Sequence, residues 1–169
     1  MNTSTLEGAS VLCIDDDADV LMLLSHVLKR HGACVTTCSS AEQAIATLVD
    51  GRFDIVISDL QMPPGLDGYD LAHAVRQMES DDHQRQKTPI MAVSGNATSP
   101  SAKRRFADFQ VYMQKPVDQK RLVHVVKKLI EADGDAVRVG SLSQWETDQT
   151  TSSPQGLRRG QEDSHDAPK

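Results

Sequence analysis

The chain has 169 residues and a net charge of −6 at pH 7; 38% of its residues are hydrophobic and only 4% are aromatic. This length fits one domain of common size with a short remainder. The acidic balance argues against nucleic acid as the main partner, because phosphate binding needs a clustered positive field. No run approaches the ~18 apolar residues of a membrane span, and residues 1–10 do not form a secretory signal, so we expect a cytoplasmic protein without a membrane segment.

The three cysteines are Cys13, Cys34 and Cys38. Their number is odd and no C-x-x-C motif is present, so the sequence suggests neither a disulfide framework nor a zinc site. We expect all three to be reduced residues of the core.

Apolar runs typical of β-strands alternate along the chain with stretches whose apolar residues recur at helical spacing. Signals for helix ends fall between them: Gly32 follows a cationic last turn, residues 40–43 resemble a capping box, and Ser99-Pro100 is typical of a helix start. The strand-like runs are Val11–Ile14, Cys34–Cys38, Phe53–Ser58, Pro89–Ser94 and Val111–Gln114.

The last helical pattern runs from about Asp118 to Glu131, with apolar residues on one face. Beyond it the apolar residues are sparse and without period, which predicts a polar, disordered tail at residues 132–169. We therefore divide the chain into an N-terminal extension at residues 1–9, one domain at residues 10–131, and the tail. The basic run at residues 103–105, on the expected fourth helix, is interpreted as a solvated charged face.

Strands that alternate with helices predict an α/β fold: a doubly wound, five-stranded parallel sheet with helices on both faces. In such sheets, ligands bind outside the carboxyl ends of the strands. The residues at or just after those ends should therefore converge on one edge of the sheet. They are Asp15, Asp16, Asp59, Ser94 and Lys115.

This combination of side chains indicates phosphoryl chemistry. Neighbouring carboxylates raise each other's pKa unless a cation joins them, and oxygen ligands alone favour Mg²⁺. Lys115 could bind an anion beside the metal, and the Ser94 hydroxyl could donate to it. An ionised aspartate can attack phosphorus without a general base, giving an acyl phosphate. Because no nucleotide-binding motif is present, the phosphoryl group would come from another molecule.

Four motifs together resemble the receiver domain of bacterial two-component response regulators. They are residues 11–17 (VLCIDDD), 54–63 (DIVISDLQMP), 89–94 (PIMAVS) and Lys115-Pro116. The resemblance covers about residues 10 to 130. It implies a flavodoxin-like sheet of order 2-1-3-4-5, and a phosphoryl group received from a sensor histidine kinase or a histidine phosphotransfer protein.

The resemblance also implies a role for each acidic residue. Asp59 would be the phosphoacceptor. Asp16 would bind Mg²⁺ directly, and Asp15 mostly through water or by orientation. Asp59 and the backbone carbonyl of Gln61 would complete the protein ligands. The loop at residues 62–68 has one residue more than is usual in that family.

The remaining implied roles concern the switch. Lys115 would pair with a phosphoryl oxygen, and Ser94 would hydrogen-bond to the phosphoryl group and draw its loop inward. Tyr112 would follow Ser94 as the aromatic switch residue, and the bond before Pro116 would be cis. The readout surface would comprise the fourth helix, the fifth strand and the fifth helix, with a downstream protein as target.

Two alternatives stay open. One is a binding module of the same fold that is never phosphorylated. The other is a phosphatase similar to the haloacid dehalogenases, with Asp15 as nucleophile and Asp17 as acid and base. On the main interpretation the chain is a single-domain receiver and not an enzyme with its own catalytic output. Its only expected reaction besides accepting phosphate is autodephosphorylation.

Overall fold

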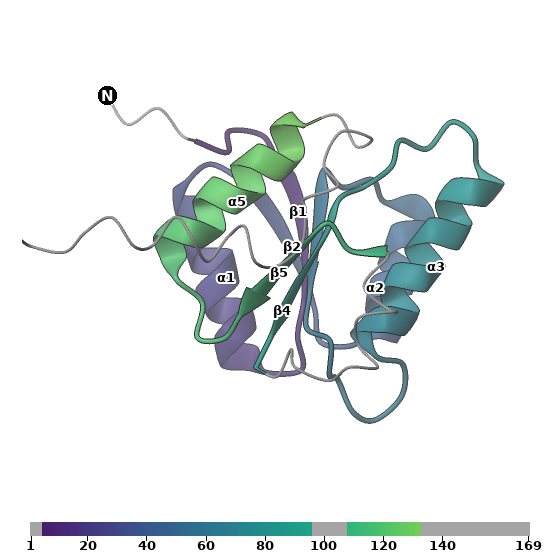
Figure 1. Ribbon diagram of the computed structural model, residues 1–169, viewed down its shortest axis with the longest axis horizontal. Coiled ribbons are helices and arrows are strands. Elements are labelled where there is room, and N and C mark those ends of the chain that lie inside the picture. Colours follow the sequence, from purple (N-terminus) through teal and green to yellow (C-terminus); the bar gives the residue numbers. More distant parts are fainter. Residues whose placement is uncertain (1–4, 96–107, 133–169) are drawn as a thin grey trace, which may run out of the picture. The chain divides into compact units, whose positions relative to one another are not determined.

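Five parallel strands form one sheet in the order β2-β1-β3-β4-β5 (Figure 1). The structure is a computed structural model that describes residues 5–95 and 108–132. The strands are β1 (Ser10–Ile14), β2 (Cys34–Cys38), β3 (Ile55–Ser58), β4 (Ile90–Ser94) and β5 (Val111–Gln114). The predicted fold class and strand order are therefore confirmed. The expected fourth helix, its basic run and the expected tail from residue 133 onward lie outside the described residues.

Helices cover both faces of the sheet, as right-handed crossovers require. In Figure 1, α1 and α5 lie on one side of the sheet, and α2 and α3 lie on the other. The helices are α1 (Ala18–Arg30), α2 (Ala41–Asp50), α3 (Gly68–Asp81) and α5 (Gln119–Glu131).

Two of the three predicted helix-end signals lie in the described residues, and both are present, one with a change; Ser99-Pro100 lies outside the described residues. Gly32 ends the first helical segment with a φ of 93°, a conformation that glycine adopts without strain. Ser40 caps α2 by accepting from the Gln43 backbone N–H at 3.2 Å. The Gln43 side chain accepts instead from the backbone of Ser39, at 2.9 Å, so the expected reciprocal bond is shifted by one residue.

Buried strand residues alternate between the two faces of the sheet. Leu12 and Ile14 of β1 pack into an aliphatic cluster with residues of α2 and α3. Strand alternation turns Val11 and Cys13 toward the opposite face, which α1 and α5 cover. The aliphatic core expected from the composition is thus split by the sheet into two layers.

Cys34 does not belong to the core, and this corrects the prediction from the sequence. Cys13 and Cys38 are buried, but Cys34 is exposed. The reason is topological: β2 is an edge strand, so its first residue is not enclosed by neighbours on both sides.

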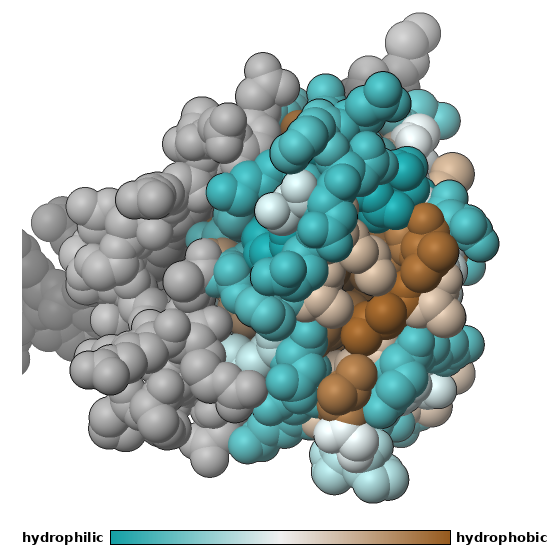
Figure 2. Space-filling model, turned by 90° about the vertical axis from the view of Figure 1, so that its right-hand side faces the viewer, coloured by the Kyte–Doolittle hydropathy of each residue, from teal (hydrophilic) through white to brown (hydrophobic). Residues whose placement is uncertain are grey.

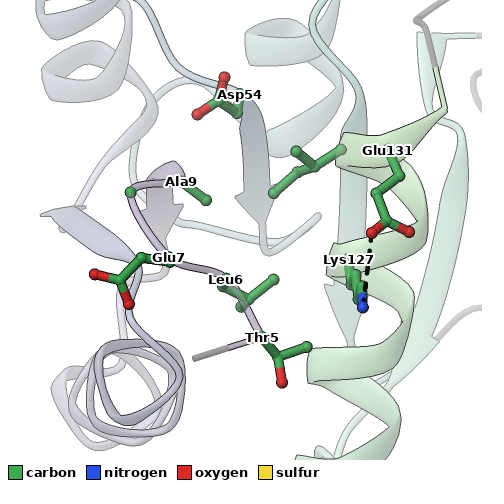
Figure 3. Close-up of a pocket in the computed structure, with 9 residues that line it drawn as sticks. Thr5, Leu6, Glu7, Ala9, Asp54, Lys127 and Glu131 are labelled. Atoms are coloured by element: carbon green, nitrogen blue, oxygen red, sulfur yellow. Dashed lines mark ion pairs between the residues drawn. The ribbon is translucent and has the colours of Figure 1, made fainter. Parts of the chain in front are cut away.

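The segment before β1 is part of the packed structure. Leu6 is 4% exposed, and its backbone N–H donates to the His31 carbonyl at 2.8 Å. Gly8 N–H donates in the same way to Gly32, at 3.1 Å. A pocket with a volume of about 250 Å³ lies between this segment and α5. Leu6, Lys127 and neighbouring residues line it (Figure 3).

Among the described residues, three large hydrophobic side chains are exposed: Met22 on α1, Val49 on α2, and Leu66 in the loop before α3. Figure 2 shows a strip of apolar surface on the face formed by α2 and α3, with hydrophilic residues on both sides. Among the helices that the structure describes, none has the length and apolar character needed to cross a membrane.

Candidate functional site

The strand register brings the predicted polar residues to one edge of the sheet. Ile14 pairs with Ser58, so Asp15 and Asp59, which come next along β1 and β3, emerge side by side. Ser94 at the end of β4 pairs with Gln114, which precedes Lys115. The expected convergence at the carboxyl edge is therefore present.

Lys115 lies between two buried carboxylates. Its Nζ is 2.7 Å from Oδ2 of Asp15 and 2.7 Å from Oδ2 of Asp59. Asp15 is 0% exposed and Asp59 is 7% exposed. Isolated charges buried to this extent would be costly, so the shared ammonium group is what makes both carboxylates tolerable at the strand ends.

The three consecutive aspartates have different environments. Ligand oxygens of Asp15, Asp16 and Asp59 all lie within 4.8 Å of one another, and Asp16 is exposed. Asp17 instead caps α1, and its side chain accepts from the backbone N–H groups of Asp19 and Val20. The acidic cluster therefore excludes the third aspartate, which the phosphatase alternative requires as its acid and base.

Burial and charge shift three pKa values at this edge. Burial raises the pKa of Asp15, and contact with Lys115 only partly opposes it. Burial alone would lower the pKa of Lys115, but its contacts with the carboxylates of Asp15 and Asp59 outweigh this and raise it. The pKa of Tyr112 is raised by burial and by the charge of Asp59. Lys115 thus stays cationic at neutral pH.

The cluster fits a hard divalent cation. Asp15 Oδ2 is buried and, among the described residues, no donor reaches it in hydrogen-bond geometry, although Lys115 neutralises its charge in part. A buried carboxylate oxygen in this condition is unusual, because buried polar atoms are normally satisfied. Several carboxylate oxygens within 4.8 Å are the donor set that Mg²⁺ prefers.

Ser94 and Tyr112 lie next to this group of charges. Ser94 is buried at 1% exposure, and its backbone carbonyl accepts from the Tyr112 hydroxyl at 2.8 Å. The same carbonyl accepts from the Lys115 backbone N–H at 3.0 Å. The Lys115–Pro116 bond is cis, as the resemblance implied. The end of β4 is therefore hydrogen-bonded to Tyr112 of β5 and to Lys115, which directly follows β5.

The loop after Asp59 is anchored from several sides. The Gln61 backbone N–H donates to Oδ1 of Asp59 at 3.1 Å. The Pro63–Pro64 bond is cis, and Gly65 has a φ of 112°. The Leu66 N–H donates to Glu42 of α2 at 3.0 Å. The longer loop is thus closed by two prolines, a glycine and a carboxylate from α2.

Gly68 is a residue at this site that the sequence reasoning missed. A Cβ at this position would collide with the backbone carbonyl of Asp59 and crowd Leu60. Gly68 is the first residue of α3, directly after its N-cap Asp67. The Asp-Gly pair before a helical pattern was the available signal for a helix start, but that pair alone does not show that the helix start lies against the Asp59 backbone.

Comparisons with known proteins agree with this geometry. The family model described as "Response regulator receiver domain" matches residues 11–127. The sensor histidine kinase GacS of Pseudomonas protegens is 33% identical over 127 residues, which cover 75% of this chain and 14% of that protein. This chain spans only 10–14% of the length of the first curated relatives it matches.

Solved structures share the fold, and two of them are compared with this chain. The chemotaxis response regulator CheY4 of Vibrio cholerae is 31% identical with a TM-score of 0.62, over 72% of this chain and 98% of that one. The response regulator TrrA of Thermotoga maritima, solved in complex with Mg²⁺-BeF, is 25% identical with a TM-score of 0.63, over 72% and 98% of the two chains. Sequence, fold and the acidic edge therefore agree, and this chain belongs to the response regulator receiver domain family.

Proposed function

We propose that Asp59 accepts a phosphoryl group from a phosphohistidine of a sensor histidine kinase or a histidine phosphotransfer protein. The observation that carries this proposal is the position of Lys115 Nζ, 2.7 Å from the carboxylates of both Asp15 and Asp59 at the carboxyl edge of the sheet. A carboxylate oxygen of Asp59 forms a bond to phosphorus while the phosphorus–nitrogen bond of the phosphohistidine breaks. The imidazole leaves with the electron pair, and an acyl phosphate remains on Asp59.

Two side chains of this chain stabilise the transferred group. Lys115 already lies beside Asp59 and offers positive charge where phosphoryl oxygens gain negative charge. Ser94, buried at the end of β4, supplies a hydroxyl donor. Ser94 ends β4, which neighbours β3, and Lys115 directly follows β5, which neighbours β4, so the fold holds both residues in place before the donor arrives.

Mg²⁺ is the cofactor that this cluster would hold. Asp15, Asp16 and Asp59 would provide carboxylate oxygens, and Gln61 its backbone carbonyl. When bound, the ion supplies positive charge that neutralises the carboxylates and the phosphoryl oxygens. The buried Asp15 Oδ2 that lacks an aligned donor supports this assignment.

Phosphorylation would act on the surface through Ser94 and Tyr112. A phosphoryl group adds about two negative charges and three strong acceptors at a strand end. Tyr112 is already bonded to the Ser94 carbonyl, so movement of the β4 end toward the new acceptors would pull on the tyrosine. The readout face would include β5, α5 and the expected fourth helix, and would bind a downstream protein.

The chain acts in this proposal as a phosphoryl acceptor and not as an enzyme with a separate catalytic output, which agrees with its family. Slow autodephosphorylation is part of the proposal. We also propose that the chain divides into an extension, one domain and a tail. We propose further that it is located in the cytoplasm, together with the phosphoryl donor. Nucleic acid and membrane are not proposed as partners.

The test is phosphorylation by a small donor. The protein is incubated with Mg²⁺ and acetyl phosphate, and its intact mass is measured for wild type, Asp59→Asn and the control Asp17→Asn. We expect wild type and Asp17→Asn to gain the mass of one phosphoryl group, and Asp59→Asn to gain none. Asp17 serves as the control because it caps α1 outside the acidic cluster, and asparagine is an equally good cap.

Two other outcomes would overturn the proposal. If Asp59→Asn is still labelled but substitution of Asp15 abolishes labelling, the nucleophile is Asp15, as the phosphatase alternative states. If neither acetyl phosphate nor a cognate kinase labels the wild type, the chain is a binding module that keeps the fold without the reaction.

A further inference from the structure

The outer edge of the sheet at β2 presents backbone N–H and C=O groups that have no hydrogen-bond partner among the described residues. Cys34 N–H donates to Ala9 at 2.7 Å, and the Cys38 carbonyl accepts from Asp15 at 3.3 Å, so these residues turn their backbone toward β1. Successive residues of a strand direct their backbone groups to opposite sides. The N–H and C=O groups of Val35 and Thr37 therefore point away from the sheet.

This edge lacks the devices that normally prevent pairing with another strand. Residues 32–41 contain no Asp, Glu, Lys, Arg or Pro, although charged residues make up 25% of the chain. Edge strands are usually guarded by charges, proline or bulges. The side chains of Cys34, Thr36 and Thr37 are exposed, and valine and threonine both favour strand pairing. An accessible strand of this kind is suited to accept a further strand.

We propose that β2 pairs with β2 of a second copy of this chain, antiparallel, across a two-fold axis at Thr36. With this axis, Val35 lies opposite Thr37 of the partner subunit, and Thr37 lies opposite Val35 of the partner subunit. Each of these two pairs exchanges two backbone N–H to C=O hydrogen bonds, so the contact has about four. Thr36 then faces Thr36 of the partner subunit as a non-hydrogen-bonded pair, with Cα atoms about 4.5 Å apart. The two sheets join into one continuous sheet.

The chemistry of the edge favours a second copy as the occupant. In a two-fold contact, a residue on the axis faces the same residue of the other copy. A charged strand would therefore place like charges opposite each other. The stretch around Thr36 is uncharged in a chain of net charge −6, so the approach of an identical edge meets no like charge within the strand. Cross-strand threonine pairs are favourable. A contact of one short strand per copy is smaller than a standard interface, so the dimer is weak and depends on concentration.

Cysteine cross-linking tests the register. In a Cys34→Ser background, Thr36→Cys and the matched control Thr37→Cys are incubated with oxidised glutathione, which takes up the two electrons and two protons of each disulfide as it is reduced. Disulfides need Cα atoms about 4.4–6.8 Å apart, a distance that the pair at position 36 meets. We expect Thr36→Cys to form a covalent dimer and Thr37→Cys, which faces Val35 of the partner subunit, to form little. Equal cross-linking of both variants, or of neither, would overturn the register.

Sedimentation equilibrium tests the pairing without oxidation. The mass of the reduced wild type should rise from 18.5 kDa toward twice that value as its concentration increases. Thr36→Lys should weaken association by about tenfold or more, because it places two ammonium groups face to face, whereas Thr36→Val should retain it. Val49→Lys, at an exposed apolar position of α2, should have no effect. A wild type that stays monomeric at all concentrations overturns the proposal, and a dimer that Val49→Lys but not Thr36→Lys dissociates assigns the contact to α2.

Discussion

Lys115 donates a 2.7 Å hydrogen bond from Nζ to Oδ2 of Asp59, a residue 56 positions earlier in the chain. The same ammonium lies 2.7 Å from Asp15, so one cation serves two carboxylates from different strands. Each carboxylate is buried and depends on this neighbour for its counter-charge. This acidic edge is therefore one of the points that hold the ends of β1, β3 and β5 together.

Replacing Lys115 by alanine should destabilise the protein in the absence of Mg²⁺. Two buried carboxylates would lose their shared cation, which we expect to lower the free energy of unfolding by about 1–3 kcal/mol. Addition of Mg²⁺ should restore more stability to this variant than to wild type. Urea unfolding at pH 7, with and without Mg²⁺, measures both effects. Lys120→Ala on α5 is the control, and equal stability of Lys115→Ala and wild type without Mg²⁺ would contradict the counter-charge role.

Mg²⁺ should raise the melting temperature of the wild type, and EDTA should reverse this. A ligand that binds only the folded state at tenfold its Kd adds about 1.4 kcal/mol. We expect Asp16→Asn to lose most of this gain, because Asp16 belongs to the acidic cluster. Asp17→Asn should keep it. A metal effect of equal size in both variants would show that Asp16 is not a ligand.

Substitution of Gly68 by alanine should disturb both stability and phosphorylation. The new Cβ would meet the Asp59 carbonyl, and overpacking of this kind costs about 1–3 kcal/mol. Gly95→Ala is the matched control: its Cβ has no atom within 4 Å, and it should raise stability by ~0.4–1 kcal/mol. Thermal unfolding and the rate of labelling by acetyl phosphate check the pair. If Gly68→Ala is as stable as wild type, α3 can move away from β3 without a loss of stability.

Stability should fall steeply at alkaline pH because of Cys13. Burial raises the pKa of this thiol from 9.0 to about 12, with a further contribution from Cys38. Between these values the unfolded chain releases a proton that the folded chain keeps, so stability decreases as pH rises, by up to about 1.4 kcal/mol per pH unit. Urea midpoints from pH 8.5 to 11 should show a shallower slope for Cys13→Ala.

Two controls separate Cys13 from other groups. Cys34→Ser, at the exposed thiol, should keep the slope of the wild type. The pKa values of Lys115 and Tyr112 are also raised in the folded protein. Above their ordinary pKa values these two groups therefore also lower the free energy of unfolding as the pH rises. That part of the slope should remain in Cys13→Ala. An unchanged slope in Cys13→Ala would show that the thiol ionises without unfolding.

The sequence predicts the polar edge well because the rule behind it is topological. In a parallel sheet the residues after each strand must emerge together, so the positions of Asp15, Asp59 and Lys115 follow once the strands are recognised. The contact between Lys115 and two carboxylates does not follow, because it depends on rotamers and on the register of β5. The cap role of Asp17 depends equally on where α1 begins.

Other features escape pattern analysis for different reasons. A single buried residue such as Leu6 has no periodicity, so the sequence does not separate it from an unstructured extension. Cys34 is assigned to the core by its residue type, but its exposure follows from the edge position of β2. The sequence recognises a strand without showing how many neighbours that strand has.

The bonds of Leu6 and Gly8 to the end of the first helical segment bear on how shorter versions of this protein should be made. A version that starts at Ser10 would discard a buried leucine and leave the His31 and Gly32 carbonyls without their donors. It would also remove one wall of the cavity beside α5. Affinity tags and fusion partners should therefore be joined ahead of Thr5, where their linker leaves these contacts in place.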